Sequence, residues 1–452
     1  MSGSRPEKGV LDSAVPGRTD DRRASSQRAL VVHPDLRNGQ ALSRTPEARL
    51  EEAAGLAEAI DLEIVAAEVC RVSRPNAGTL LGGGNVERYR LMVQVEELGI
   101  AIVDADLSPV QQRNLERAWN CKVVDRTGLI LEIFGARART KEGQLQVELA
   151  ALTYQRSRLV RSWTHLERQR GGYGFMGGPG ERQIEMDRRI IDDRITRLKR
   201  DLDEVRKTRD EHRKQRRRVP YPVIALVGYT NAGKSTLFNR LSRATVFEHD
   251  MLFATLDPTM RGIRLPDGQD VILSDTVGFI SDLPTQLVAA FRATLEEVQE
   301  ADIIVHVRDI SHPDSEAQKQ DVEQVLRELD VGAAVDEGLV EALNKIDKLS
   351  PERREVVDQQ AARDPNKIPV SAQTGEETDT LGRAIEARLS SGYRCVNIHV
   401  PLEDGRALAW LYDRGHVMDR RDDEATAHLK VNLDPADVDR FQHRHADVSV
   451  DH

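Results

Sequence analysis

A glycine-rich turn followed by Lys234 and Ser235 carries the clearest chemistry in the sequence. The apolar run 223–227 leads directly into the pattern G-x-x-x-x-G-K-S, and a helix-forming stretch follows. In this order, backbone amides cradle phosphates, the lysine neutralises the β- and γ-phosphates, and the serine hydroxyl ligates magnesium. A chance Gly-Lys-Ser turn is the weaker alternative because strand and helix flank the loop. The predicted phosphate-binding residues are Gly228, Tyr229, Thr230, Asn231, Ala232, Gly233, Lys234 and Ser235.

A second apolar run ends at a carboxylate, in the sequence Asp275, Thr276, Val277, Gly278. We expect Asp275 to serve magnesium through water. The amide of Gly278 can bond the γ-phosphate because no side chain blocks it.

The segment between these two motifs offers Thr255 as a further hydroxyl ligand. The predicted metal ligands are Ser235 and Thr255, and the residues predicted to act on the reacting phosphate are Lys234, Thr255 and Gly278. The nucleotide-binding loop around Thr255 is predicted to comprise Phe253, Ala254, Thr255, Leu256 and Asp257.

The sequence Asn344, Lys345, Ile346, Asp347 follows another apolar run and predicts a guanine site. The Asp347 carboxylate can accept hydrogens from N1 and N2 of guanine, which adenine cannot supply, and a buried unpaired carboxylate is costly. Asn344 and Lys345 would brace the loop and the base. The last predicted contacts come from the backbone of Ser371, Ala372 and Gln373. Together these motifs predict a GTP-hydrolysing enzyme with GTP and GDP as substrate and product and Mg²⁺ as cofactor.

Phe279 occupies the position after Asp-x-x-Gly, where Ras-like enzymes have a glutamine that orients the attacking water. A phenyl ring neither donates nor accepts a hydrogen bond. We therefore expect feeble intrinsic hydrolysis that a partner raises, whether or not Phe279 also packs in a core.

The rest of the chain must position these residues, and short apolar runs alternate with helical stretches on both sides of one long helical region. The runs expected to form strands include residues 130–134. Such alternation is typical of α/β domains with mostly parallel sheets. We predict an α/β fold class with five parts: a disordered leader (1–27), a small α/β domain (28–142), a helical hairpin (143–219), a P-loop GTP-binding domain (220–392) and a small α+β domain (393–452).

The hairpin is predicted from apolar residues at helical spacing on both sides of the glycine-rich stretch 171–180. Between Arg156 and Arg218 there are 20 Arg and Lys residues against 11 Asp and Glu, although the whole chain carries a net charge of −10. This basic arm can bind RNA phosphates. The plainer alternative is a solvated coiled-coil face.

The 452 residues contain only three cysteines, far apart, and no apolar run approaching the ~20 residues of a membrane span. We expect a monomeric cytoplasmic protein with reduced cysteines, and leave peripheral membrane association open.

The residue identities within these motifs resemble those of the HflX family of GTPases. The resemblance rests on residues 228–235, 252–258 and 275–280, and on the arm segments 177–181 and 185–190. It implies a GTPase that binds the ribosome, mainly its large subunit and the RNA there, and separates or rescues stalled ribosomes. Two positions depart from the family pattern: Asn85 and Gln373 stand where lysine is usual.

Two other functions compete with this one. The chain could be an RNA-binding module whose nucleotide is only a structural ligand. Its first α/β domain could instead drive ATP-dependent RNA remodelling, although the lysine missing at Asn85 argues against that.

Overall fold

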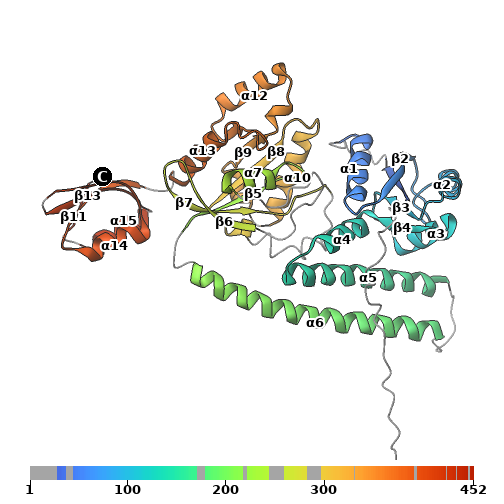
Figure 1. The fold of residues 1–452 in the computed structure, drawn as a ribbon. Coiled ribbons are helices and arrows are strands. Elements are labelled where there is room, and N and C mark those ends of the chain that lie inside the picture. The colour runs from blue at the N-terminus through green and yellow to red at the C-terminus, as the bar shows by residue number, and fades with distance from the viewer. Residues whose placement is uncertain are drawn as a thin grey trace, which may run out of the picture.

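In its described residues, the computed structural model contains three β-sheets with flanking helices, and a pair of long helices (Figure 1). It describes residues 28–36, 44–169, 179–216, 221–243, 259–281, 297–329, 331–390, 394–423, 425–433, 435–445 and 448–451. The predicted α/β fold class is confirmed. The boundaries proposed for the five parts stay predictions, and the leader lies outside the described residues.

The N-terminal domain is a four-stranded parallel sheet in the order β2-β1-β3-β4. Helices in this domain begin at residues suited to capping: the Thr45 hydroxyl accepts the Ala48 amide, and Ser108 forms a capping box with Gln111. The elements are β1 (Arg28–Leu36), α1 (Pro46–Glu58), β2 (Glu63–Val72), α2 (Gly83–Val95), β3 (Ile100–Val103), α3 (Pro109–Trp119), β4 (Lys122–Asp125) and α4 (Arg126–Arg137).

The strand expected at residues 130–134 is wrong, because this segment lies inside helix α4. Asp125 ends strand β4 and caps α4 through the Gly128 amide. The buried residues of the segment then recur at helical spacing: Leu129, Ile130, Ile133 and Phe134.

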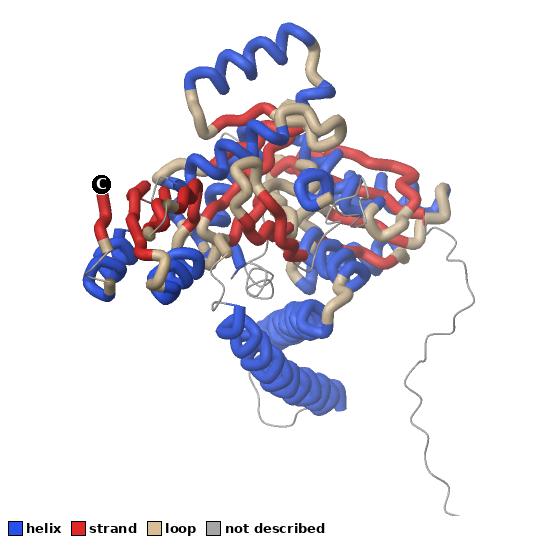
Figure 2. Tube along the Cα trace, turned by 60° about the vertical axis from the view of Figure 1, so that its left-hand side comes forward, coloured by secondary structure: helices blue, strands red, loops and turns tan. Residues whose placement is uncertain are grey.

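Two helices lie side by side below the sheets, α5 (Lys141–Gln169) and α6 (Pro179–Arg216) (Figures 1 and 2). Arg156 bonds Asp192 at 3.1 Å, and Arg194 bonds Glu148 at 2.9 Å across the pair. Ile195, Leu198 and Leu202 are buried on α6. Residues 170–178, most of the predicted glycine-rich bend, lie outside the described residues.

The central domain carries a six-stranded sheet in the order β10-β9-β8-β5-β7-β6, parallel except for β6. β5, the first strand of the domain, lies inside the sheet, so the loop that follows it sits at the edge where neighbouring parallel strands also end. The elements are β5 (Val223–Val227), α7 (Lys234–Ser242), β6 (Thr259–Arg264), β7 (Asp270–Asp275), β8 (Ile303–Asp309), α10 (Ser315–Glu328), α11 (Gly332–Asp336), β9 (Val340–Asn344), η1 (Ile346–Lys348), α12 (Pro351–Arg363), β10 (Lys367–Pro369) and α13 (Thr378–Ser390).

The C-terminal domain is an antiparallel sheet in the order β12-β13-β11-β14 with two helices. The apolar runs 396–400 and 429–433 predict strands, which lie within β11 and β13, and residues 405–414 predict a helix, which is α14; the other three elements are not predicted from the sequence. The elements are β11 (Arg394–Pro401), α14 (Gly405–Arg414), β12 (His416–Asp422), β13 (Thr426–Leu433), α15 (Pro435–Arg444) and β14 (Ser449–Asp451).

One apolar cluster runs through both the N-terminal and central domains. It includes Ile133 and Phe134 of α4 together with Val277, Phe279 and Val322 of the central domain. These two domains therefore share buried apolar surface, which stabilises their contact. Within the described residues, no helix combines the length and apolar character needed to cross a membrane.

Candidate nucleotide-binding site

The loop between β5 and α7 is built around two glycines that cannot carry side chains. A Cβ on Gly228 would lie 2.2 Å from the Val307 carbonyl oxygen, and one on Gly233 would lie 2.2 Å from Nδ2 of Asn344. Gly233 also has a φ of 92°, in the left-handed region that favours glycine. The backbone of the loop therefore packs directly against β8 at Gly228 and against the Asn344 side chain at Gly233, and these two contacts fix its path.

Lys234 starts helix α7 and is buried beneath this loop. Its Nζ donates to the carbonyl oxygens of Gly228 at 3.1 Å and Tyr229 at 2.8 Å. Burial lowers the pKa of Lys234 to about 8, with Asp275 opposing the shift and Lys345 adding to it. A bound phosphate would supply the anionic partner that a buried ammonium needs.

Ser235 and Asp275 come from neighbouring elements and meet at the end of β7. The Ser235 hydroxyl donates to Oδ2 of Asp275 at 2.7 Å, and Asp275 is fully buried. Hydroxyl and carboxylate oxygens are ligands that Mg²⁺ accepts, so this pair fits one such ion directly or through its water. Within the described residues there is no group of three or more His, Cys, Asp and Glu that could hold a metal. An ion at Ser235 would therefore also need water or phosphate oxygens.

Gly278 lies directly against the phosphate loop. A Cβ there would come within 2.8 Å of Cγ2 of Thr230 and 3.1 Å of Nζ of Lys234. The Phe279 amide donates to the Gly228 carbonyl at 3.1 Å, and the Thr230 amide donates to the Phe279 carbonyl at 2.8 Å. The structure thus brings Gly278 beside the lysine that the sequence assigned to the same phosphate.

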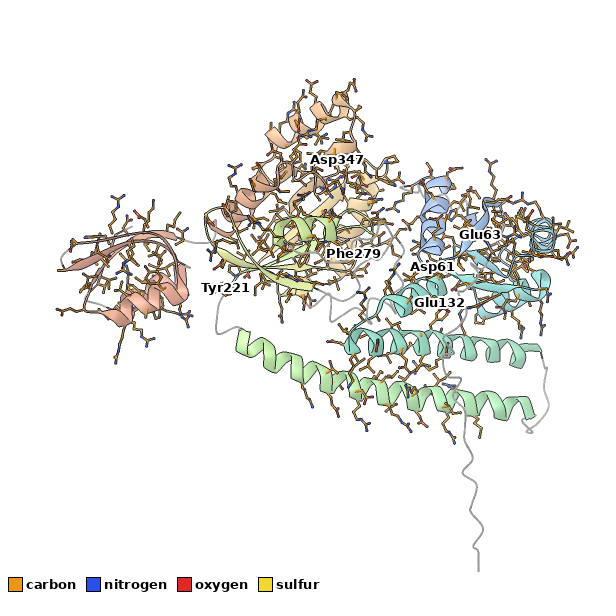
Figure 3. The ribbon with its side chains drawn as sticks, in the orientation of Figure 1. Asp61, Glu63, Glu132, Tyr221, Phe279 and Asp347 are labelled. Carbon is orange, nitrogen blue, oxygen red and sulfur yellow. The ribbon has the colours of Figure 1, made fainter. Side chains whose placement is uncertain are left out.

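Phe279 itself is 1% exposed and belongs to the apolar cluster shared by the two domains. Figure 3 shows Phe279 on the side of the central domain that faces the N-terminal domain. Its ring therefore packs in a core and offers no polar atom to a water molecule.

Asn344 joins the phosphate loop to the predicted guanine loop. Its Nδ2 donates to the Ala232 carbonyl at 2.8 Å, while its Oδ1 accepts the Ala372 amide at 2.9 Å. Lys345 has a φ of 67° and its Nζ lies 2.7 Å from Oδ2 of Asp309. The backbone after β9 is thereby turned so that Asp347 follows in a short helix, η1.

The Asp347 carboxylate is held by Ser371, whose hydroxyl donates to Oδ1 at 2.6 Å. Figure 3 shows Asp347 near α12, well apart from Phe279. The predicted phosphate and guanine residues thus lie on different loops at one edge of the sheet. Residues 253–257, including Thr255, lie outside the described residues, so the structure does not place that part of the predicted site.

Sequence reasoning missed Arg240 and Asp309, which support the guanine loop. Nε of Arg240 donates to the Ala372 carbonyl at 3.2 Å, and Nη2 of Arg240 bonds the Gln373 carbonyl. Asp309 fixes Lys345. The sequence signal for Arg240 is weak, since it is a basic residue in the last turn of α7 whose partners lie more than a hundred residues away along the chain.

Comparisons with known proteins identify the family. Four family models match consecutive parts of the chain: the N-terminal region of GTP-binding GTPases (residues 47–135), their middle region (137–216), a 50S ribosome-binding GTPase (223–345) and the HflX C-terminal domain (356–450). The GTPase HflX of Magnetococcus marinus is 50% identical over 393 residues, which cover 87% of this chain and 90% of that protein. The chain belongs to the HflX family of GTPases.

Other HflX proteins are similar over the same length. The GTPase HflX of Escherichia coli is 41% identical over 393 residues, 87% of this chain and 90% of its own. A crystal structure of SsGBP with GDP covers 80% of this chain and 98% of its own at 24% identity, with a TM-score of 0.46. That score is too low to compare how the domains lie. The resemblance inferred from the motifs is confirmed, and the chain is a GTPase of the HflX family.

Proposed function

We propose that this HflX-family GTPase binds the ribosome, mainly the large subunit and its RNA, and uses GTP binding and hydrolysis to separate or rescue stalled ribosomes. The proposal is supported by a predicted guanine-nucleotide site in the same chain as a helical pair that carries exposed cations. Arg189, Arg197, Lys199 and Lys207 are exposed on α6, and none forms an ion pair with another described residue. The family model over residues 223–345 is described as a 50S ribosome-binding GTPase, which supports the same partner.

In the proposed site, Lys234 binds the β- and γ-phosphates, Ser235 and Asp275 hold Mg²⁺, and Gly278 donates its amide to the γ-phosphate. Mg²⁺ would neutralise charge on the phosphate oxygens. Asp347 reads guanine, with Ser371 orienting its carboxylate. Thr255 is proposed as a further magnesium ligand supplied by the loop 253–257.

Sedimentation with purified ribosomal subunits tests the proposal. The protein should co-sediment with large subunits in a non-hydrolysable GTP analogue and much less in GDP. Lys234→Ala should lose the nucleotide dependence because its phosphate site is damaged. Binding to subunits that is equal in both nucleotides would instead favour an RNA-binding module with a structural nucleotide. An absence of binding in either nucleotide would reject the ribosomal role.

A further inference from the structure

The contact between the N-terminal and central domains contains a group of buried polar side chains beside the phosphate loop. We call it the interdomain cluster: Arg44, Glu52, Asp104 and Arg126 of the N-terminal domain, and Tyr229 and Ser281 of the central domain. The four N-terminal side chains are between 3% and 10% exposed. Figure 1 shows α1 and α4, which supply Glu52 and Arg126, on the side of their domain nearest the central sheet.

The hydroxyl group of Tyr229 is at the centre of the interdomain cluster. It accepts hydrogen bonds from Nη1 of Arg44 at 2.8 Å and from the Ser281 amide at 2.8 Å, and it donates to Oε2 of Glu52. The Arg44 guanidinium also lies 4.7 Å from the centre of the Tyr229 ring. The second residue of the phosphate loop is therefore held by the other domain.

Ser281 is held by the same N-terminal residues. Nη2 of Arg126 donates to the Ser281 carbonyl at 2.9 Å and to its hydroxyl at 3.1 Å, and that hydroxyl donates to Oε1 of Glu52 at 3.0 Å. Arg126 is in turn fixed by Asp104 at 2.7 Å and by a short contact with Glu52. Backbone and side chain of Ser281 thus both have partners across the interface.

The charges in the interdomain cluster support one another. Burial alone would raise the pKa of Glu52, but Arg126 and the Tyr229 hydroxyl outweigh it, so the pKa lies below its usual value. Burial alone would lower the pKa of Arg126, but Asp104 and Glu52 outweigh it and raise that pKa. Buried ion pairs contribute little net stability, yet they specify geometry because any other arrangement leaves a charge unpaired.

Only Phe279 and Ile280 separate Ser281 from Gly278, and both are buried. Phe279 is bonded through its backbone to Gly228 and Thr230 of the phosphate loop. The backbone from Gly278 to Ser281 is thus fixed to the phosphate loop at one end and to the N-terminal domain at the other. The described contacts of the interdomain cluster include neither Asp347, which is proposed to read the guanine base common to GTP and GDP, nor Ser235, which is proposed to hold Mg²⁺.

We propose that Arg126 and Glu52 are positioning residues for GTP. By holding Tyr229 and Ser281 they keep the Gly278 amide where it meets the γ-phosphate, and so the N-terminal domain sets the preference of the central domain for GTP over GDP. This inference rests on the proposed assignment of Gly278 to the γ-phosphate. Linkage makes the effect mutual, so GTP also strengthens the contact between the two domains.

Equilibrium binding of GDP and of a non-hydrolysable GTP analogue, with Mg²⁺, tests this proposal. Tyr229→Phe removes all three bonds of the hydroxyl, and Ser281→Ala removes two bonds of the side chain while keeping the backbone. Each should weaken binding of the analogue roughly 5- to 20-fold, the scale of a typical coupling between sites. Ser281 lies outside the phosphate loop, so Ser281→Ala should change GDP affinity by less than about twofold. Arg126→Lys should retain part of the preference for the analogue over GDP. Arg126→Ala would leave the buried carboxylates of Glu52 and Asp104 without their main partner, so this variant tests folding more than positioning.

The reciprocal effect is measured by amide hydrogen exchange in the full-length protein. Residues 52–57 and 126–134 should exchange more slowly with the analogue than with GDP, and this difference should vanish in Tyr229→Phe.

Arg90→Ala is the matched control, because Arg90 pairs with Glu87 on exposed α2 in the same domain, away from the cluster. It should leave both affinities and the exchange pattern unchanged. Equal losses of GDP and analogue affinity in Ser281→Ala would overturn the positioning role. Unchanged or raised analogue affinity in Tyr229→Phe and Ser281→Ala would also overturn it. Nucleotide binding by the wild type, and its loss in Lys234→Ala, test the proposed nucleotide site. This test does not depend on the ratio of analogue affinity to GDP affinity.

Discussion

Lys234 bonds only neutral carbonyl groups in the described structure, and its pKa of about 8 follows from burial. Above that pH the free protein has lost the proton, but bound phosphates favour the ammonium. Nucleotide binding at about pH 8.5 should therefore take up a proton, and affinity should fall by up to about tenfold per pH unit above 8.

Calorimetric titration of GDP in two buffers of different ionisation enthalpy measures this uptake. Lys234→Arg is the control, because a guanidinium stays protonated and any binding it retains should show no uptake. Proton uptake that is the same in Lys234→Arg would assign the titration to another group.

The guanine contact proposed for Asp347 requires an oriented carboxylate, and the Ser371 hydroxyl donates to that carboxylate at 2.6 Å. Asp347→Asn should reverse one hydrogen-bond polarity, lowering GTP affinity by at least about tenfold and raising affinity for xanthosine triphosphate. Competition binding with the two nucleotides measures the switch, with Asp358→Asn on exposed α12 as control. If Asp347→Asn bound GTP as tightly as the wild type, the guanine assignment would be wrong.

Among the secondary-structure elements, α6 is predicted to contact RNA through its exposed basic residues. Changing Arg189, Arg197, Lys199 and Lys207 to Glu should weaken binding to large subunits, because these exposed cations have no described ionic partner to lose. The slope of log affinity against log salt concentration should fall by roughly one for each phosphate contact removed.

The control variant replaces Arg by Lys and Lys by Arg at the same four positions, so the charge is kept. It should keep both the affinity for large subunits and the salt dependence of that affinity. If the Glu variant also kept both, α6 would be only a solvated helix face.

The long elements and the phosphate loop could be predicted because each is defined by local pattern. Helix α4 could not, since its apolar residues 129–134 are nearly continuous and such a run fits either a strand or a buried helix. The Asp125 cap decides for the helix. In the C-terminal domain, β12 has mostly exposed residues and no apolar alternation to mark it.

In the whole molecule, the buried Phe279 ring offers no polar atom to the attacking water, and we expect a partner to supply the missing group. We expect large ribosomal subunits to raise the single-turnover rate of GTP hydrolysis by at least about tenfold, since one positioned catalytic group contributes 10²- to 10⁴-fold. Rapid mixing of protein, GTP and saturating subunits measures chemistry separately from product release.

Small subunits provide the comparison, and binding must be shown in the same buffer. Equal rates with and without bound large subunits would overturn the activation model. A fast free enzyme would show that another residue of this chain replaces the glutamine.

The interdomain cluster lay beyond sequence reasoning altogether. Arg44 and Tyr229 are 185 residues apart in the chain, and Arg126 and Ser281 are 155 apart. No local periodicity links such pairs, and each residue alone suits an exposed surface. Only the packing of two domains shows that they meet.

The separation of Arg126 and Ser281 also has a consequence during synthesis. At the usual elongation rate of about 5–20 residues per second, the 155 residues that follow Arg126, up to and including Ser281, take roughly 8–30 s to make. Through that interval the nascent N-terminal domain presents to water the surface that its partner will later cover. We expect the charged residues among the apolar ones to keep that surface hydrated, which would limit association of the growing chain before the central domain covers it.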